Sequence, residues 1–376
     1  KSCSAGGDSE VQRRDRALDP LNAENIGLTA FLRVVSINRY MKNIECYLSN
    51  DVPVNTRGPN KGKCMKPTTL KGRSLLNWKD WTPEEIRFLL ELSHSVKKDL
   101  RTGDIHQRFR GKSIALLFEK RSTRTRCAFE TAFGEEGGHP VFLSTQDIQL
   151  GSKESVEDTA RVLGRMFSAI EFRGFRQETV EILARESGVP VYNGLTDDYH
   201  PTQVLADIMT LEESFGKSEG KNLCFVGDGR NNVARSLIII CAKLGVNCTI
   251  ITPAELSTDK GLLDEAAVWA AESGAKISVT DKLDAVAGAD ALYTDVWVSM
   301  GEEAKRDKRI ALLSPYQINR ELMSKCGNDS TIFLHCLPAV KEEEVTTEVI
   351  EGPMSRVWDQ AENRKHTIKA IMLATI

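Results

Sequence analysis

Short apolar runs alternate with amphipathic segments along most of this chain. Residues 112–118 form an apolar run that predicts a buried strand, and helical spacing resumes over residues 127–133. Strands that alternate with helices indicate parallel sheets with helices on both faces. Similar apolar runs predict further strands over residues 169–172, 189–192, 223–226, 248–251, 276–279, 291–293 and 331–334.

Three helices are predicted from their spacing and end signals. For the first, Thr82 suits the N-cap, Pro83 suits the first helical position, and Glu85 completes a capping box. A second long helix is predicted over residues 201–215, because the glycine-containing stretch 216–220 ends it. The last helix of the chain is predicted over residues 364–375.

The helix over residues 201–215 separates two sets of predicted strands. We therefore expect an α/β fold with two doubly wound parallel-sheet domains joined by helices, which a length of 376 residues accommodates. The domains are expected at residues 74–204 and 205–350, with segment 351–376 packing back on the first domain. Ligands of such sheets bind outside the carboxyl ends of the strands, so we expect the active site in the cleft between the domains.

Residues 1–73 differ from the rest, because Gly, Ser, Asn and Pro are frequent and residues 55–63 are typical of a linker. A targeting peptide is one interpretation, but organellar presequences are poor in acids, and Asp8, Glu10 and Asp15 argue against it. We expect a poorly ordered extension that is dispensable for folding and activity.

The composition narrows the class of protein. The chain has 41% hydrophobic and 27% charged residues, which is typical of a globular protein. Its net charge of −3 gives no general reason to expect nucleic acid or an anionic membrane as a partner, and the apolar runs are shorter than a spanning helix. The nine cysteines are odd in number and form no C-x-x-C pair, which indicates reduced thiols and a cytoplasmic location, with an organelle left open.

The turn after the strand at 112–118 is rich in hydroxyls and guanidiniums. Ser122, Thr123, Arg124 and Thr125 stand where a strand feeds a helix. Backbone N–H groups, hydroxyls and a guanidinium at a helix N-terminus form a binding site for a phosphate group. The alternative is a basic capped turn on a solvated face, since hydroxyls favour N-caps in any case.

Three further motifs follow this loop in a fixed order, and together the four resemble the aspartate/ornithine carbamoyltransferase family. They are His200-Pro-Thr-Gln203, Asp295-Val-Trp-Val-Ser-Met-Gly301 and His335-Cys-Leu-Pro338, of which the last two point to the ornithine branch. The resemblance covers the chain from about Leu76 to its C-terminus. It implies transfer of the carbamoyl group of carbamoyl phosphate to the δ-amine of L-ornithine, giving L-citrulline and phosphate, by a homotrimer without a cofactor.

The resemblance also implies which domain binds which substrate, with carbamoyl phosphate on the first domain and ornithine on the second. His200 and Gln203 lie one helical turn apart, so both are expected to donate to the carbamoyl oxygen. Without the resemblance, Arg173 would be interpreted as a surface salt-bridge partner and His200 as a turn residue. The residues implied for the donor are Ser122, Thr123, Arg124, Thr125, Arg173, His200, Gln203, Cys336, Leu337 and Arg364.

The residues implied for ornithine are Asn232, Asp295, Ser299 and Met300. Segment 227–232 is superficially like a dinucleotide-binding loop, but Asn232 stands where the third glycine is needed, which argues against a dehydrogenase. Cys336 is either a covalent nucleophile or a group that orients the amine, and we favour the second because carbamoyl phosphate is already activated. No His, Cys and Asp residues have the sequence spacing of metal ligands, so we expect no metal.

Two alternatives to ornithine transfer stay open at this point. One is a carbamoyltransferase with another acceptor, such as aspartate or putrescine. The aspartate branch typically has Pro at the position of Cys336, and a diamine would not need Asp295 and Ser299 to hold α-amino groups. The other is a non-catalytic metabolite-binding protein with the same fold, which degraded motifs would support.

Overall fold

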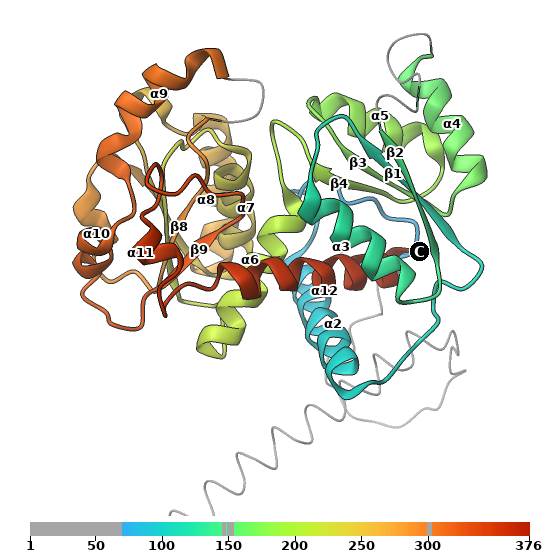
Figure 1. Ribbon diagram of the computed structural model, residues 1–376, viewed down its shortest axis with the longest axis horizontal. Coiled ribbons are helices and arrows are strands. Elements are labelled where there is room, and N and C mark those ends of the chain that lie inside the picture. Colours follow the sequence, from blue (N-terminus) through green and yellow to red (C-terminus); the bar gives the residue numbers. More distant parts are fainter. Residues whose placement is uncertain (1–69, 145–147, 149–153, 299–302) are drawn as a thin grey trace, which may run out of the picture. The chain divides into compact units, whose positions relative to one another are not determined.

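The computed structural model describes residues 70–144, 148, 154–298 and 303–376, and two all-parallel β-sheets lie within them (Figure 1). The first sheet has the strand order β2-β1-β3-β4. The second has the order β7-β6-β5-β8-β9. These sheets confirm the predicted α/β fold. The strands are β1 (Ser113–Phe118), β2 (His139–Ser144), β3 (Ala169–Arg173), β4 (Val191–Leu195), β5 (Asn222–Val226), β6 (Asn247–Ile251), β7 (Ile277–Thr280), β8 (Ala291–Thr294) and β9 (Ile332–His335).

Helices connect the strands and cover the sheets. The α-helices are α2 (Pro83–Thr102), α3 (Thr123–Gly134), α4 (Val156–Met166), α5 (Gln177–Ser187), α6 (Pro201–Phe215), α7 (Asn232–Leu244), α8 (Lys260–Ser273), α9 (Arg306–Leu313), α10 (Arg320–Lys325), α11 (Thr347–Ile350) and α12 (Val357–Thr375). Short 3-10 turns lie at Ala254–Leu256, Leu283–Val286, Glu303–Lys305 and Ser314–Tyr316. None of the helices in these described segments combines the length and apolar content needed to cross a membrane.

Most predicted elements are present, and the differences have local causes. Helix α2 has the predicted Thr82–Glu85 capping box, and α6 has the predicted bounds. Helix α3 begins at Thr123, four residues earlier than expected, because Ser122 caps it. Strand β4 is shifted toward the C-terminus, past Pro190, which has no N–H to donate to a neighbouring strand.

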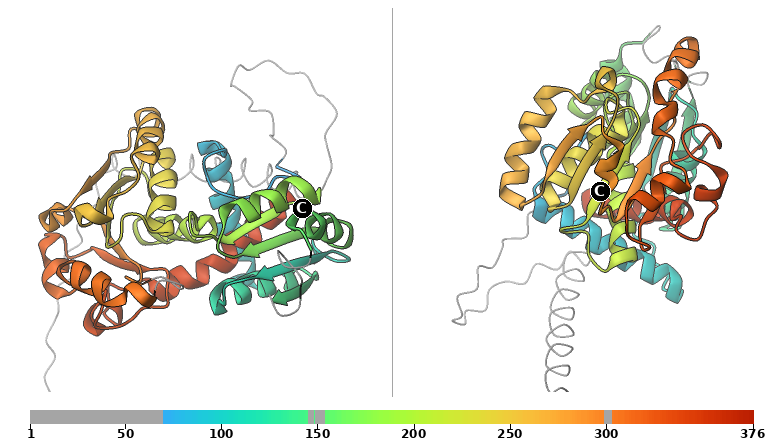
Figure 2. Two further views of the ribbon diagram at one scale, coloured as in Figure 1. Left: turned by 90° about the horizontal axis from the view of Figure 1, so that it is seen from above. Right: turned by 90° about the vertical axis from the view of Figure 1, so that its left-hand side faces the viewer.

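Helix α12 is longer than predicted and begins at Val357. Its early turns contain buried polar residues, so an apolar stripe does not mark them in the sequence. The helix packs against α2, α3, α6 and β9, and Figures 1 and 2 show it running from β9 toward α2 and α3. Lys97 of α2 donates to Asn363 at 2.6 Å, and Lys369 donates to Glu135 beyond α3 at 2.8 Å. These contacts fix the residues of α12 that face the site described below.

The described chain begins at Leu70, which is buried, and Gly72 N donates to Thr375 O at 2.8 Å. Arg73 forms an ion pair with Glu85 at 2.5 Å. Residues 70–73 therefore pack on the main body, although the expected extension includes them. The remaining residues of that extension, 1–69, lie outside the described residues.

Residues Pro67–Ile376 form one compact unit, so a protein that begins at Pro67 is expected to unfold at the same temperature as the full chain. A protein that begins at Ser74 loses the burial of Leu70 and is expected to be less stable by roughly 1.5–3 kcal/mol. Thermal unfolding of the three proteins measures both effects. A lower unfolding temperature for the Pro67 protein would show that residues before it contribute to the fold.

Candidate active site

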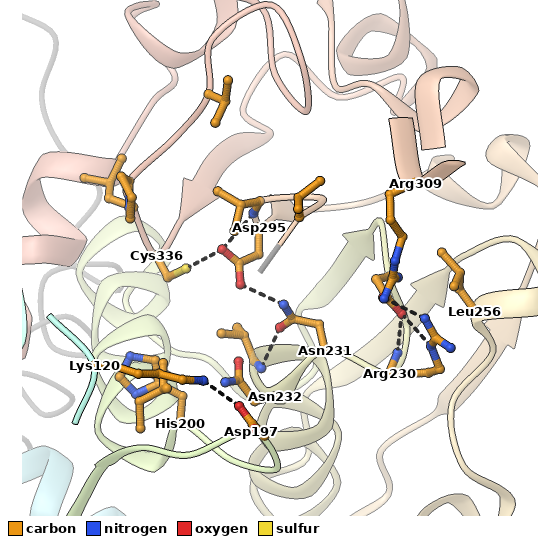
Figure 3. A pocket seen from close by; sticks show the side chains of 18 of the residues that line it. Lys120, Asp197, His200, Arg230, Asn231, Asn232, Leu256, Asp295, Arg309 and Cys336 are labelled. Atoms are coloured by element: carbon orange, nitrogen blue, oxygen red, sulfur yellow. Dashed lines mark hydrogen bonds and ion pairs between the residues drawn. The ribbon is translucent and has the colours of Figure 1, made fainter. Parts of the chain in front are cut away.

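The predicted site residues follow the carboxyl ends of strands in both sheets. Ser122 follows β1 and Arg173 ends β3, while Asp295 follows β8 and Cys336 follows β9. These residues line one cavity of about 1340 Å³ (Figure 3). The predicted residues that line it are Ser122, Arg124, Arg173, His200, Asn232, Asp295, Cys336, Leu337 and Arg364.

The remaining predicted residues lie elsewhere. Thr123 is exposed on the first turn of α3. Thr125 and Gln203 are buried next to lining residues. Ser299 and Met300 lie outside the described residues.

The turn after β1 holds two arginines from other elements. Ser122 Oγ accepts from Thr125 N at 3.2 Å, which caps α3 and turns Thr125 inward. Thr125 Oγ1 accepts from Arg173 Nη1 at 3.2 Å and from Arg364 Nη2 at 3.0 Å. One hydroxyl of the predicted loop thereby brings together guanidiniums from β3 and α12.

Three guanidiniums concentrate positive charge at this end of the cavity. Burial, together with the charge of neighbouring guanidiniums, lowers the pKa of Arg173 and of Arg364 to about 10. Burial also lowers the pKa of Arg124. Arg173 and Arg364 stay charged at neutral pH, because a pKa of about 10 is still well above it. Crowded guanidiniums favour a multiply charged anion, and phosphate oxygens fit their N–H groups.

His200 is a neutral imidazole at this site. Burial lowers its pKa well below the usual range, and the positive charges of Arg364, Arg173 and Arg124 add to the effect. Its backbone N donates to Ser236 Oγ at 2.9 Å, which anchors the start of α6 on α7. Within the described segments, no group hydrogen-bonds to its Nδ1. A buried neutral imidazole can polarise a ligand oxygen without adding a charge.

A neighbouring acid holds the amide of Gln203, and the donation expected from the sequence stays a prediction. Its Nε2 donates to Asp207 Oδ1 at 2.8 Å, and none of the described residues hydrogen-bonds to its Oε1. One of the two N–H groups of the amide is therefore already engaged by Asp207. The side chain also offers an unpartnered acceptor, which suits an N–H of the ligand.

The same cavity also contains an acid and a thiol in contact. Cys336 Sγ donates to Asp295 Oδ1 at 2.9 Å, and Asn231 Nδ2 donates to Asp295 Oδ2 at 2.8 Å (Figure 3). Burial, followed by the charge of Asp295, raises the pKa of the Cys336 thiol well above its ordinary value. The pair is therefore a thiol donating to a carboxylate at neutral pH.

Asn231 supports this pair from the start of α7, whereas Asn232 beside it bonds the segment after β4. Asn231 Oδ1 accepts from Val233 N at 2.7 Å and so caps the helix, while its amide holds Asp295. Asn232 Nδ2 donates to Thr196 O at 2.6 Å. We did not predict Asn231, although its place before a helix after a strand is the sequence signal of an N-cap.

Two groups of side chains in the described residues have possible metal-ligand atoms close together. Asp295, His335 and Cys336 have ligand atoms within 4.8 Å of one another, and so do Asp99, Asp104 and His106. Sequence spacing could not show the first group, because its members come from two strands. Hydrogen bonds already engage His335, whose Nδ1 accepts from Leu337 N at 2.8 Å and whose Nε2 lies 3.3 Å from Glu344. That no metal takes part stays a prediction.

Two more parts of the cavity wall were missed by the sequence analysis. Lys120 Nζ lies 2.5 Å from Asp197 and over the ring of Phe175. At the other end, Asp228 forms ion pairs with Arg230 and Arg309 (Figure 3). The pairs Lys120–Asp197 and Asp228–Arg309 join segments that are distant in sequence, and the pair Asp228–Arg230 lies within one loop. Only the folded chain reveals these contacts.

One cavity combines an arginine cluster that suits a phosphate group with a carboxylate–thiol pair that can bind an amine, which indicates an enzyme that binds a phosphorylated donor and an amine together. Family models agree with this class. Residues 73–213 match the carbamoyl-P binding domain and residues 219–375 match the Asp/Orn binding domain of aspartate/ornithine carbamoyltransferase. The chain belongs to the aspartate/ornithine carbamoyltransferase family.

Individual relatives give the same result. The chain is 67% identical over 308 residues to a protein named ornithine carbamoyltransferase from Caldanaerobacter subterraneus subsp. tengcongensis, covering 82% of this chain and 98% of that protein. It is 60% identical, with the same coverage, to the protein of that name from Thermotoga maritima. The structure of the ornithine carbamoyltransferase from Pyrococcus furiosus matches with a TM-score of 0.80 and 44% identity, covering 82% of this chain and 98% of that chain.

Proposed function

We propose that this chain transfers the carbamoyl group of carbamoyl phosphate to the δ-amine of L-ornithine, giving L-citrulline and phosphate. The main support from the geometry is that the cluster of Arg124, Arg173 and Arg364 and the Asp295–Cys336 pair line one cavity. The names of the relatives support the choice of ornithine.

The donor binds with its phosphate at the arginine cluster. The amine nitrogen attacks the carbamoyl carbon, and negative charge grows on the carbonyl oxygen. His200 and the guanidiniums donate to that oxygen, and one such preorganised donor is typically worth about 2.7–4 kcal/mol. The bond from carbon to the bridging oxygen then breaks, the attacking nitrogen gives up one proton, and the departing phosphate takes this proton while the arginines hold its charge.

Different protein groups bind the phosphate and the carbamoyl group of the donor. Guanidiniums hold the phosphate, while Gln203 Oε1 accepts from the carbamoyl N–H. A buried acceptor left without a donor costs about 1–3 kcal/mol, so this contact discriminates against donors without an N–H.

The acceptor amine must be neutral to attack. Asp295 and Cys336 are placed to orient the δ-amine and to help it lose its proton, and the Leu337 carbonyl extends the same wall. Leu337 has φ 56°, an uncommon value for a residue other than glycine that often marks functional loops. Asn232, Ser299 and Met300 are proposed to hold the amino-acid end of ornithine.

An assay of product formation with ornithine, aspartate and putrescine tests the proposal. We expect carbamoylation of ornithine to exceed that of the other two acceptors. A preference for aspartate or putrescine would assign another carbamoyltransferase activity. Tight binding of carbamoyl phosphate without turnover of any acceptor would support the non-catalytic alternative.

We also propose a cytoplasmic homotrimer with domains at residues 74–204 and 205–350. Family membership supports the trimer, and the free thiols of the six described cysteines fit a reducing compartment. Light scattering coupled to size-exclusion chromatography measures the assembly.

Replacing Asn231 by Ala is expected to weaken the acceptor wall and the cap of α7 together. Loss of a hydrogen bond to a charged group is worth about 1.5–3 kcal/mol, so KM for ornithine should rise about 10–100-fold with KM for carbamoyl phosphate nearly unchanged. Loss of the cap should reduce the free energy of unfolding by about 1 kcal/mol. Steady-state kinetics and thermal unfolding measure the two effects.

The variant Asn231→Ser is the matched control, because serine can cap α7 but is too short to reach Asp295. It should restore stability without restoring KM for ornithine. An unchanged KM in both variants would show that Asp295 needs no support from this residue.

A further inference from the structure

Asp207 is a buried acid that the mechanism above does not use. It is fully buried in α6, one helical turn after Gln203. Its Oδ1 accepts from Gln203 Nε2 at 2.8 Å and from Gln360 Nε2 at 2.7 Å. Burying a carboxyl group is costly even when it is hydrogen-bonded, so a role beyond filling space is indicated.

The orientation of both amides follows from one backbone group. His335 N can only donate, and Gln360 Oε1 accepts from it at 2.9 Å. The nitrogen of Gln360 must therefore face Asp207. Asp207 Oδ1 then acts as an acceptor, so Gln203 must also present its nitrogen to it. None of the described residues donates to the carbonyl oxygen of Gln203, which is buried beside the residues that line the cavity.

We propose that Asp207 is a positioning residue that fixes the orientation of the Gln203 amide. Gln203 Oε1 then accepts from the carbamoyl N–H. The site therefore prefers a carbamoyl donor over acyl phosphates that have no N–H. This role rests on the proposed function, because it requires carbamoyl phosphate as the donor. Without Asp207 the amide can rotate and present its NH₂ group to the ligand NH₂ group, which removes the preference. Sites built to hydrogen-bond one group reject analogues that lack it.

Asp207 also supports the acceptor wall, and the experiment must separate the two effects. Through Gln360 it fixes the backbone of His335, which precedes Cys336. Gln360 Nε2 also lies 3.2 Å from the hydroxyl of Tyr293, so a residue of β8 helps to hold Gln360 in place. An effect through Gln360 should alter ornithine usage, whereas an effect through Gln203 should alter donor preference.

The test compares KM for carbamoyl phosphate with the inhibition constant of acetyl phosphate, which has a methyl group in place of the NH₂ group. In the full-length chain, Asp207→Leu should lower the preference for carbamoyl phosphate over acetyl phosphate about tenfold or more. Asp207→Asn keeps an oxygen that accepts from both amides, so it should retain most of the preference. If Asp207→Leu does not fold, Asp207→Ser, which is too short to reach Gln203, replaces it.

A double-mutant cycle shows whether Asp207 acts through Gln203. In a Gln203→Leu background, replacing Asp207 should cause no further loss of preference. Thr210→Val is the matched control for stability, because Thr210 is buried on α6 and bonds Asn363 instead of Gln203. It should lower the unfolding temperature and leave the preference unchanged.

Three outcomes would overturn the role of Asp207. The first is an unchanged preference for carbamoyl phosphate over acetyl phosphate in Asp207→Leu. The second is an equal loss of affinity for these two compounds. The third is that replacing Asp207 in the Gln203→Leu background lowers the preference as much as it does in the wild type. The wild-type assay separates these outcomes from failure of the proposed function. A wild-type chain that forms citrulline while Asp207→Leu keeps its preference disproves only the role of Asp207.

Discussion

Replacing Arg124 by Ala is expected to raise KM for carbamoyl phosphate about 10²-fold while the protein stays folded. Arg124 lines the cavity next to Arg173 and Arg364, so its loss removes a charge-assisted contact to the donor phosphate. Hydrogen bonds to charged groups are worth about 1.5–3 kcal/mol, and loss of the charge itself adds to this. The inhibition constant of inorganic phosphate should rise in parallel, because phosphate occupies the same contacts.

Arg126→Ala is the matched control near the start of the same helix, α3. Arg126 forms an ion pair with Glu130 at 2.9 Å and lies over the ring of Phe142, with its side chain 44% exposed. Its replacement should leave KM for carbamoyl phosphate and the inhibition constant of inorganic phosphate nearly unchanged, since exposed ion pairs of this kind contribute little free energy. Unchanged kinetics in Arg124→Ala, or an equal loss in Arg126→Ala, would contradict the assignment of the phosphate site.

The sheets were predictable because strands buried on both faces form nearly continuous apolar runs. Residues 223–226 and 248–251 are examples, and they lie within β5 and β6. Strand β2 was not predicted, because it lies at the edge of its sheet, is only partly buried and contains Pro140. The early turns of α12 were missed for a related reason, since Gln360 and Asn363 are buried but polar.

The sequence predicted which residues belong to the candidate site, but it did not predict most of the contacts between them. Family resemblance placed Arg173 and Arg364 at the donor, but only the fold shows both bound to the hydroxyl of Thr125. The orientation of Gln203 depends on Asp207 and on Gln360, which is remote in sequence. Such contacts depend on the packing of α6 against α12, which no local pattern encodes.

Cys336 is expected to orient the amine without forming a covalent bond. Its thiol donates to Asp295, and burial with the nearby carboxylate keeps it protonated at neutral pH. A protonated thiol is a poor nucleophile, and a donor with phosphate as its leaving group needs no thioester intermediate. The carbamoyl group should therefore pass directly to the amine when both substrates are bound.

Replacing Cys336 by Ser should thus impair the enzyme without abolishing it. Serine still donates to Asp295, but the shorter C–O bond displaces the contact, and misplacement of a reactant can cost on the order of 10²-fold in rate. Most of the loss should appear in ornithine usage, and Cys127→Ser, at an exposed thiol, should be unaffected. Initial rates with both substrates varied should give intersecting lines in the wild type. A covalent intermediate would instead give parallel lines and a carbamoyl group that can be trapped on Cys336. The Cys336→Ser variant would then be inactive, because removing a nucleophile leaves almost no activity.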